Sequence, residues 1–505
     1  MQPIEFFLRA AERWPDATAL QGPEGSLSYA ALAGRVRAAA SAIQALAPDT
    51  RARIAICAGN HFAHVVALFG TLLAGRIWVP LNPRAGRAEL LRSVTFTEAA
   101  LVIAEESLAG KVAGAGVATL QYAPGEADRS FDLALARHGD VPPERIRHDL
   151  AETQAIKFTG GTTGLPKGVM QSYRAWNTCV VSLMESLRAD TDTRYLAVAS
   201  ITHGTSTFLL PVLGRGGTIV LPRSTRPADV LDQMERERIT AVFMPPTLIY
   251  TLLEEPGVGA RDWSALRHFT YAAAPMRADK ILQAREVFGV LTTGYGQTEA
   301  PAAISALSVE ESRDPRNLLS VGRPTLLTEV AIMAPDGRLL PAGETGEIVV
   351  RGDLVMSGYW RQPDKTAEAL RDGWLRTGDG GYLDERGFLF LKDRIRDVII
   401  TGGFNVYPGD VEAALGAHPA VYDCAVFGIE DAHWGEAVHA AVQLRPGADA
   451  VTAQALAAWV KASLDSVKAP KAVHIFDELP RTANGKVSRK EIQAQVAANL
   501  RQARS

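Results

Sequence analysis

A glycine- and threonine-rich segment at residues 159–168 carries the clearest chemistry in the sequence. It reads Thr-Gly-Gly-Thr-Thr-Gly-Leu-Pro-Lys-Gly and follows residues 155–158, which predict a strand. Glycines let a backbone turn tightly and bring several N–H groups close to one anion. Threonine hydroxyls add hydrogen-bond donors, and Lys167 adds a positive charge. The segment therefore predicts a phosphate site, with a flexible surface loop as the alternative.

This loop differs from the phosphate loop of the Walker type. In that motif the lysine is followed by Ser or Thr and then by a helix. Here Lys167 is followed by Gly168, Val169 and Met170, which predict a returning strand. The sequence therefore favours a loop between two strands as the phosphate-binding element.

A second group of residues, 295–299, reads Tyr-Gly-Gln-Thr-Glu. An aromatic ring beside a glycine can stack on a purine while the backbone stays close. The Glu299 carboxylate is a hard oxygen ligand suited to Mg²⁺. The alternatives are a core aromatic residue for Tyr295 and a solvated charge for Glu299.

Two more residues have side chains suited to a nucleotide. Asp379 can accept two hydrogen bonds from a ribose diol, although a turn cap is the alternative. Lys486 follows Asn484-Gly485, a pair typical of a tight turn that would present the lysine at a fixed point. An ammonium there can bridge a carboxylate and a phosphate, whereas a lone lysine on a tail is usually only solvated.

Taken in order, these segments resemble the signatures of the adenylate-forming superfamily, which includes acyl-CoA synthetases, luciferases and the adenylation domains of peptide synthetases. The resemblance runs from about residue 4 to residue 492 and is greatest to an acyl-CoA ligase. This sequence departs from the usual pattern with Gly160 for Ser, Gly380 for an apolar residue and Arg396 for Asp or Lys. It also has alanines at 272–274, where a turn with glycine is usual.

The resemblance implies a role for individual residues. It assigns catalysis to Lys486, Thr163 and Lys167, the metal ligand to Glu299, the acid pocket to His203, Thr202 and Tyr250, and the interdomain hinge to Arg396. It assigns the binding of nucleotide and CoA to Thr159, Gly161, Thr162, Gly164, Ala273, Ala274, Tyr295, Gly296, Gln297, Thr298, Asp379, Arg394, Gly402 and Gly403.

The implied reaction has two steps and uses ATP, Mg²⁺ and coenzyme A. A carboxylic acid and ATP give acyl-AMP and pyrophosphate, and acyl-AMP and CoA then give acyl-CoA and AMP. Transfer to a carrier protein, and a nucleotide-binding protein without turnover, remain open alternatives. The pocket candidates are mostly small or neutral, which favours a medium-chain, branched or aromatic monocarboxylic acid over a dicarboxylic acid.

The elements that must position these residues alternate between strand and helix. Helices are expected at 4–13 and 29–46 and strands at 53–57 and 77–81, and the alternation returns over 198–254. This order predicts an α/β fold with mostly parallel sheets flanked by helices. A polar stretch at 123–154 reads as a connector. Short apolar runs separated by turn residues predict a β-rich subdomain at about 322–393.

The sequence predicts two domains, an adenylation domain at 1–393 and a small mobile α+β lid at 394–505 with its hinge near Arg396. The net charge of −3 argues against a broad basic surface for nucleic acid. Three distant cysteines without a CxxC pair argue against zinc and disulfides. No apolar run reaches the length of a membrane span. We expect a cytoplasmic monomer or homodimer that binds small molecules.

Overall fold

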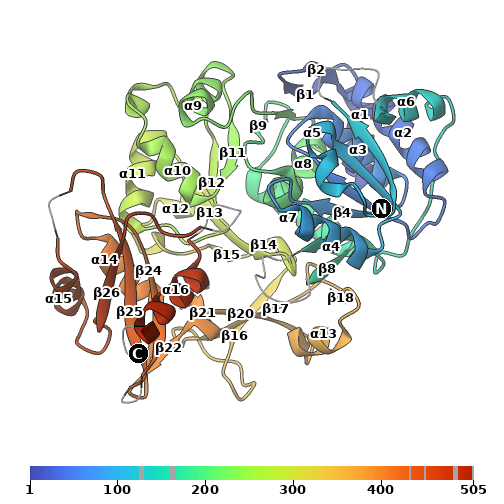
Figure 1. The fold of residues 1–505 in the computed structure, drawn as a ribbon. Coiled ribbons are helices and arrows are strands. Elements are labelled where there is room, and N and C mark those ends of the chain that lie inside the picture. The colour runs from blue at the N-terminus through green and yellow to red at the C-terminus, as the bar shows by residue number, and fades with distance from the viewer. Residues whose placement is uncertain (124–129, 159–166, 432–433, 449–450, 482–486, 503–505) are drawn as a thin grey trace. The chain divides into compact units, whose positions relative to one another are not determined.

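The computed structural model describes residues 1–123, 130–158, 167–431, 434–448, 451–481 and 487–502 (Figure 1). The chain divides into two compact units. The first unit comprises Met1–Ala273, Gln283–Val330 and Val349–Arg376, and the second comprises Ala274–Leu282, Ala331–Ile348 and Thr377–Ser505. The domain boundary at residue 394 stays a prediction.

A seven-stranded sheet in the first unit has the order β18-β8-β7-β4-β3-β5-β6. Its inner strands are parallel, and β8 and β18 add antiparallel pairs at one edge. All five residues of β4 are buried, as expected where helices cover both faces of a parallel sheet. The strands are β3 (Arg53–Cys57), β4 (Ile77–Leu81), β5 (Leu101–Glu105), β6 (Ala118–Tyr122), β7 (Thr153–Phe158), β8 (Gly168–Ser172) and β18 (Gly358–Tyr359).

A nine-stranded sheet in the same unit has the order β15-β14-β13-β12-β11-β9-β10-β1-β2. Strands β1 and β9 to β13 are parallel to their neighbours in this run, whereas β2, β14 and β15 pair antiparallel. The predicted α/β fold with mostly parallel sheets is confirmed. The strands are β1 (Thr18–Gly22), β2 (Gly25–Ser28), β9 (Arg194–Leu196), β10 (Thr218–Val220), β11 (Ala241–Met244), β12 (His268–Tyr271), β13 (Thr292–Gln297), β14 (Ala300–Leu307) and β15 (Arg323–Pro324).

The helices that flank these sheets begin where the sequence provides a cap. The Ser28 hydroxyl accepts a hydrogen bond from the Ala31 N–H at the start of α2. The stretch at 123–154 was expected to be a connector, but it contains helix α6, in which the apolar side chains Phe131 and Ala134 are buried. The helices used below are α1 (Ile4–Arg13), α2 (Tyr29–Leu46), α3 (Phe62–Leu73), α6 (Ser130–His138), α7 (Tyr173–Leu187), α8 (Ser206–Leu213), α10 (Pro246–Leu253) and α13 (Pro363–Ala369).

The β-rich segment forms a five-stranded sheet of β16 (Glu329–Met333), β17 (Gly346–Arg351), β20 (Trp374–Leu383) and β19 (Leu370–Arg371), with β21 (Leu389–Arg394) paired to β20. A further five-stranded sheet lies in the second unit, in the order β23-β22-β25-β24 with β26 paired to β25. Its strands are β22 (Ile399–Thr401), β23 (Phe404–Val406), β24 (Val421–Asp431), β25 (Gly435–Leu444) and β26 (Ala472–Phe476), and α14 (Pro408–Gly416) and α15 (Ala453–Ser463) contribute to its core.

Candidate active site

The phosphate loop is framed by two antiparallel strands, as the sequence predicted. Strand β7 ends at Phe158, which pairs with Gly168 at the start of β8. A Cβ atom on Gly168 would lie 2.9 Å from the Ile156 side chain, so the strand pair leaves no room for a larger residue there. The predicted nucleotide-binding residues Thr159, Gly161, Thr162 and Gly164 and the predicted catalytic residue Thr163 lie outside the described residues.

Lys167 and Glu299 are brought together by a residue that the sequence did not reveal, Tyr359. The Lys167 ammonium lies 5.0 Å from the centre of the Tyr359 ring. The Tyr359 hydroxyl donates a hydrogen bond of 2.8 Å to Oε1 of Glu299. Tyr359 and Glu299 are both buried, whereas Lys167 is exposed. One side chain therefore contacts both the predicted phosphate-binding cation and the predicted metal ligand.

The segment Tyr295–Thr298 runs from the end of β13 into the turn before β14. A Cβ atom on Gly296 would lie 2.5 Å from the Ala302 nitrogen, so the two backbones approach as closely as only glycine permits. The Thr298 carbonyl accepts a hydrogen bond of 2.8 Å from the Gln171 amide. Tyr295 is buried, and its stacking on adenine stays a prediction.

Gln297 presents an unused donor in this segment. Its side-chain nitrogen is buried and has no hydrogen-bond partner in the part of the chain that the structure describes. A buried donor left unsatisfied costs about 1–3 kcal/mol. The side chain is thus suited to bind a polar ligand atom, in keeping with its predicted role.

Ala273 adopts a backbone conformation that explains why a glycine is usual at this turn. Its φ angle is +74°, in the left-handed region that side chains disfavour. Ala273 is exposed and ends a long segment of the first unit, while Ala274 begins the second. The alanine is accommodated here at a conformational cost.

In the second unit, Asp379 and Arg394 lie opposite each other on β20 and β21. The Arg394 Nε atom is 3.2 Å from Asp379 Oδ1. The Asp379 side chain is 15% exposed and that of Arg394 is 50% exposed, so the carboxylate is fixed while the guanidinium remains accessible. The two residues predicted to contact the nucleotide are therefore neighbours.

The chain turns immediately after this pair. Arg396 lies in a 3₁₀ turn, Ile395–Asp397, with its guanidinium exposed and 3.5 Å from the Asp397 carboxylate. An exposed polar side chain tolerates a change in backbone dihedral angles, which is what a hinge requires. The role of Arg396 stays a prediction.

Gly402 and Gly403 form the turn of the β22–β23 hairpin. Their φ angles are +57° and +83°, and Thr401 pairs with Phe404 across the turn. Two consecutive left-handed residues are characteristic of a turn that strongly prefers glycine. A Cβ atom on Gly402 would lie 3.0 Å from the Trp434 ring, whereas one on Gly403 would meet nothing within 4 Å. The predicted catalytic residue of this unit, Lys486, lies outside the described residues.

The predicted acid-pocket residues all lie in the first unit, on two segments. His203 is exposed in the turn Ile201–Thr205, where its φ and ψ of −115° and −131° depart from helical values and kink the chain. Thr202 is buried, and its hydroxyl is 2.7 Å from that of Ser200. Tyr250 is half-buried on α10. The backbone is therefore kinked at His203, the residue predicted to border the acid.

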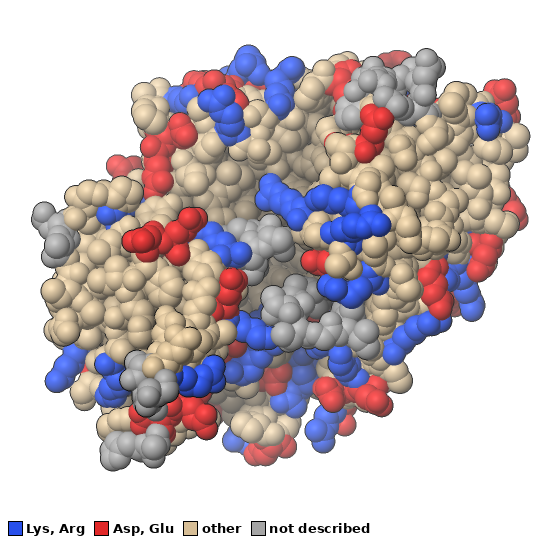
Figure 2. All heavy atoms as spheres, viewed as in Figure 1, with Lys and Arg blue, Asp and Glu red and all other residues tan. Residues whose placement is uncertain are grey.

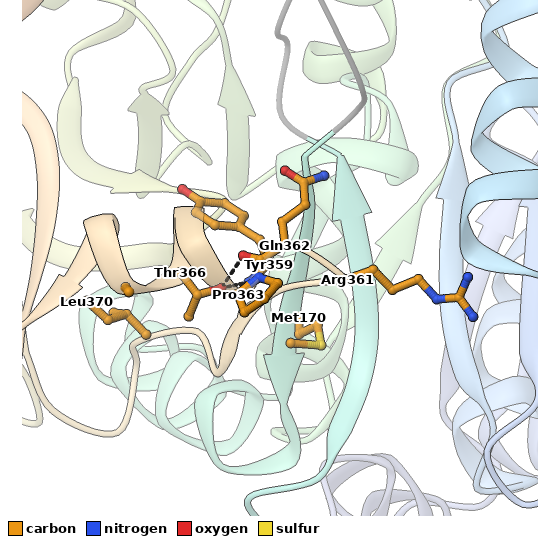
Figure 3. A pocket seen from close by; sticks show the side chains of 8 residues that line it. Met170, Tyr359, Arg361, Gln362, Pro363, Thr366 and Leu370 are labelled. Carbon is orange, nitrogen blue, oxygen red and sulfur yellow. Dashed lines mark hydrogen bonds between the residues drawn. The ribbon is translucent and has the colours of Figure 1, made fainter.

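An open pocket of about 420 Å³ lies beside Tyr359, between β8 and α13 (Figure 3). The Tyr359 N–H donates a hydrogen bond of 2.9 Å to the Thr366 hydroxyl, which ties the strand to the helix. The pocket lining contains Met170 and Leu370 but none of the residues predicted to bind the acid.

The described residues contain no cluster of three or more His, Cys, Asp or Glu side chains able to hold a metal. A magnesium ion bound through phosphate oxygens needs only one or two protein carboxylates, so Glu299 alone fits that role.

Acidic and basic side chains are interspersed on the face drawn in Figure 2. None of the described helices has the length and apolar character needed to cross a bilayer.

The strand pair around the predicted phosphate loop, the buried Glu299 and the Asp379–Arg394 pair of the second unit agree with the nucleotide-dependent enzyme that the sequence predicted. The chain belongs to the family of AMP-binding enzymes, whose model matches residues 7–360. The model of the AMP-binding enzyme C-terminal domain matches residues 410–486.

Individual relatives are similar over most of the chain. A feruloyl-CoA synthase from Amycolatopsis sp is 35% identical over 491 residues, which cover 96% of this chain and 97% of that protein. The medium/long-chain-fatty-acid–CoA ligase FadD8 of Mycobacterium tuberculosis is 38% identical over 375 residues, 72% of this chain and 65% of that protein. The amide bond synthetase McbA from Marinactinospora thermotolerans has a similar structure, with a TM-score of 0.88, 32% identity and coverage of 98% and 99%.

Proposed function

We propose that this protein is an AMP-forming acyl-CoA ligase. It converts a carboxylic acid and ATP to acyl-AMP and pyrophosphate, and then transfers the acyl group to CoA. The observation that carries the proposal is the contact of Tyr359 with both Lys167 and Glu299 beside the phosphate loop. The CoA ligases among the relatives support the choice of reaction.

In the first half-reaction the acid carboxylate attacks the α-phosphate of ATP, and pyrophosphate leaves. The protein forms no covalent bond in this step, so its contribution is positioning and the neutralisation of charge. Lys167 and the hydroxyls of the phosphate loop hold the phosphates, and Asp379 and Arg394 hold the ribose. Lys486 stabilises the charge that develops between the carboxylate and the α-phosphate.

Glu299 is the residue that would hold Mg²⁺. Its carboxylate is buried and one of its two oxygens accepts the Tyr359 hydroxyl, which orients the group. When bound, the ion neutralises phosphate charge and makes pyrophosphate a better leaving group. Gln297 supplies a buried N–H that is free to bind the nucleotide.

In the second half-reaction the CoA thiolate attacks the acyl-AMP carbonyl and AMP leaves. The second unit carries both Lys486 and the Gly402-Gly403 turn, so a rotation about Arg396 would exchange one for the other. The turn has no side chains at its tip, which suits a narrow passage for the pantetheine arm.

We infer that the acid is a monocarboxylic acid with an aromatic ring or an apolar chain. The relatives named for feruloyl-CoA and for medium or long fatty acids support this class. His203 and Tyr250 are the side chains proposed to border it, while the burial of the Thr202 hydroxyl against Ser200 limits that residue to an indirect part.

The test measures exchange of labelled pyrophosphate into ATP with Mg²⁺ and a panel of aromatic and aliphatic acids. We expect acid-dependent exchange and, with CoA present, formation of acyl-CoA. Lys486→Ala should lose exchange but retain transfer from supplied acyl-AMP to CoA. An equal loss of both steps would contradict the role of Lys486.

A second acceptor is suggested by the similarity to the amide bond synthetase McbA, which extends over nearly the whole chain. In that case acyl-AMP would be attacked by an amine, and no CoA would be consumed. Parallel reactions with CoA, with a panel of amines and with an acyl carrier protein distinguish the three acceptors by their products.

A further inference from the structure

A lysine is buried in the first unit on β7, the strand that precedes the predicted phosphate loop in the sequence. Lys157 lies on β7, two residues before the loop begins, and is 7% exposed. Its ammonium lies 4.8 Å from the centre of the Trp78 ring on β4 and 5.1 Å from that of Trp176 on α7. It donates a hydrogen bond of 2.9 Å to the hydroxyl of Ser206 at the start of α8.

The charge of Lys157 has no ionic partner among the residues that the structure describes. The titratable group that faces it is the Cys179 thiol on α7, and burial raises the pKa of that thiol to about 12, so it is neutral. Burial lowers the pKa of Lys157 itself to about 8. A buried ion without a counter-ion costs free energy that an apolar side chain of similar size would not. Packing alone therefore does not explain a lysine at this position.

Ser206 transmits the contact to the predicted acid pocket. Its hydroxyl accepts the hydrogen bond from Lys157 and donates one of 2.8 Å to the carbonyl of His203. His203 is the residue whose backbone leaves helical geometry within the turn Ile201–Thr205. The ammonium thus fixes the carbonyl of the most distorted residue of this turn.

A second series of contacts leads from Lys157 through Trp176 toward the predicted metal ligand. The Trp176 indole N–H donates a hydrogen bond of 3.0 Å to the side-chain oxygen Oε1 of Gln171. The Gln171 amide in turn donates to the carbonyl of Thr298, the residue before Glu299. Lys157 thus hydrogen-bonds Ser206 directly, whereas it reaches the segment that carries Glu299 only through the ring of Trp176.

We propose that Lys157 is a positioning residue that holds the His203 turn in the geometry needed to align the acid with ATP. This role rests on the proposed function, because it requires that the acid bind next to His203. Without the ammonium, Ser206 loses the donor that orients it, and the turn relaxes. The acid is then bound less well and is poorly aligned, while the contacts to ATP remain.

The test replaces Lys157 with methionine, which keeps the length of the side chain and removes the charge. We expect the KM for the acid to rise, or kcat to fall, by about 10-fold to 100-fold, as for other small misalignments. The KM for ATP should stay within about twofold. The melting temperature should be equal to or higher than that of the parent protein, because a buried unpaired charge is removed.

Lys111→Met is the matched control. Lys111 also has a partly buried ammonium, which donates to the carbonyls of Pro83 and Ala85 and not to Ser206. This variant should lower the melting temperature and leave the KM for the acid unchanged. Ser206→Ala should reproduce the kinetic effect of Lys157→Met with a smaller change in packing. If Lys157→Met does not fold, the KM of Ser206→Ala for the acid tests whether the contact between Lys157 and Ser206 positions the His203 turn.

The pH dependence gives an independent readout. In the parent protein the KM for the acid should rise above pH 8 as Lys157 loses its proton, and this rise should be absent in Lys157→Met. Unchanged acid kinetics in both Lys157→Met and Ser206→Ala, with normal exchange by the parent, would overturn the role of Lys157 alone. An absence of acid-dependent exchange by the parent would overturn the proposed function and this role with it.

Discussion

Tyr359→Phe removes one hydroxyl and leaves the ring against Lys167. The Glu299 carboxylate then loses a hydrogen bond of 2.8 Å within a buried environment. A hydrogen bond to a charged group contributes about 1.5–3 kcal/mol. Loss of a residue that orients a metal ligand typically lowers metal affinity about 10-fold to 100-fold, or about 1.4–2.7 kcal/mol. We therefore expect the Mg²⁺ concentration for half-maximal exchange to rise by about that factor.

Pyrophosphate exchange is measured as a function of Mg²⁺ at fixed ATP, and binding of Mn²⁺ in the presence of ATP is measured by electron paramagnetic resonance as a readout without turnover. Tyr122→Phe is the matched control, since the Tyr122 hydroxyl is buried and makes no hydrogen bond within the described part of the chain. It should leave both readouts unchanged. A Tyr359→Phe protein whose Mg²⁺ dependence lies within about twofold of the parent would refute the positioning of Glu299 by Tyr359.

Three further predictions concern the second unit and the turn at Ala273. Gly402→Ala should impair acyl transfer to CoA more than Gly403→Ala, because a Cβ atom at residue 402 would lie 3.0 Å from the Trp434 ring and one at residue 403 would meet nothing within 4 Å. Both variants should retain pyrophosphate exchange. Separate assays of the two half-reactions test this. Ala273→Gly should raise stability by about 1 kcal/mol by relieving a left-handed alanine, a change that urea denaturation can measure. Burial lowers the pKa of His439 to about 4, below its usual 6.5, so the unfolded chain binds this proton more strongly and stability is lost as pH falls from 6.5 to 4. His439→Phe should therefore flatten the fall in melting temperature over this range.

The local elements were predictable because their signals are local. The helices at 4–13 and 29–46 have the bounds that their apolar periodicity and the Ser28 cap indicated. The strand pair around the predicted phosphate loop followed from the strand-like segments on both sides of the glycines. Helix α6 was missed because proline and polar residues on both sides of it dominate the stretch at 123–154, while only two of its side chains are buried.

The candidate site was predictable only where a residue belongs to a recognisable motif. Tyr359 lies 60 residues from Glu299 in the sequence, and Lys157 lies 49 residues from Ser206. Contacts over such separations depend on how the strands are paired, which no local spacing encodes. Asp379 and Arg394 were each identified from their own segments, but their ion pair follows from the register of β20 and β21.

The position of Tyr359 explains how two opposite charges can stay available at one site. A direct ion pair between Lys167 and Glu299 would neutralise both groups before a nucleotide arrived, and none is formed in the described structure. With Tyr359 between them, the ammonium rests on the ring face and the carboxylate on the hydroxyl. Both are weaker partners than an opposite charge. The triphosphate can therefore bind the Lys167 ammonium, and the metal ion can bind the Glu299 carboxylate, without first breaking an ion pair between them.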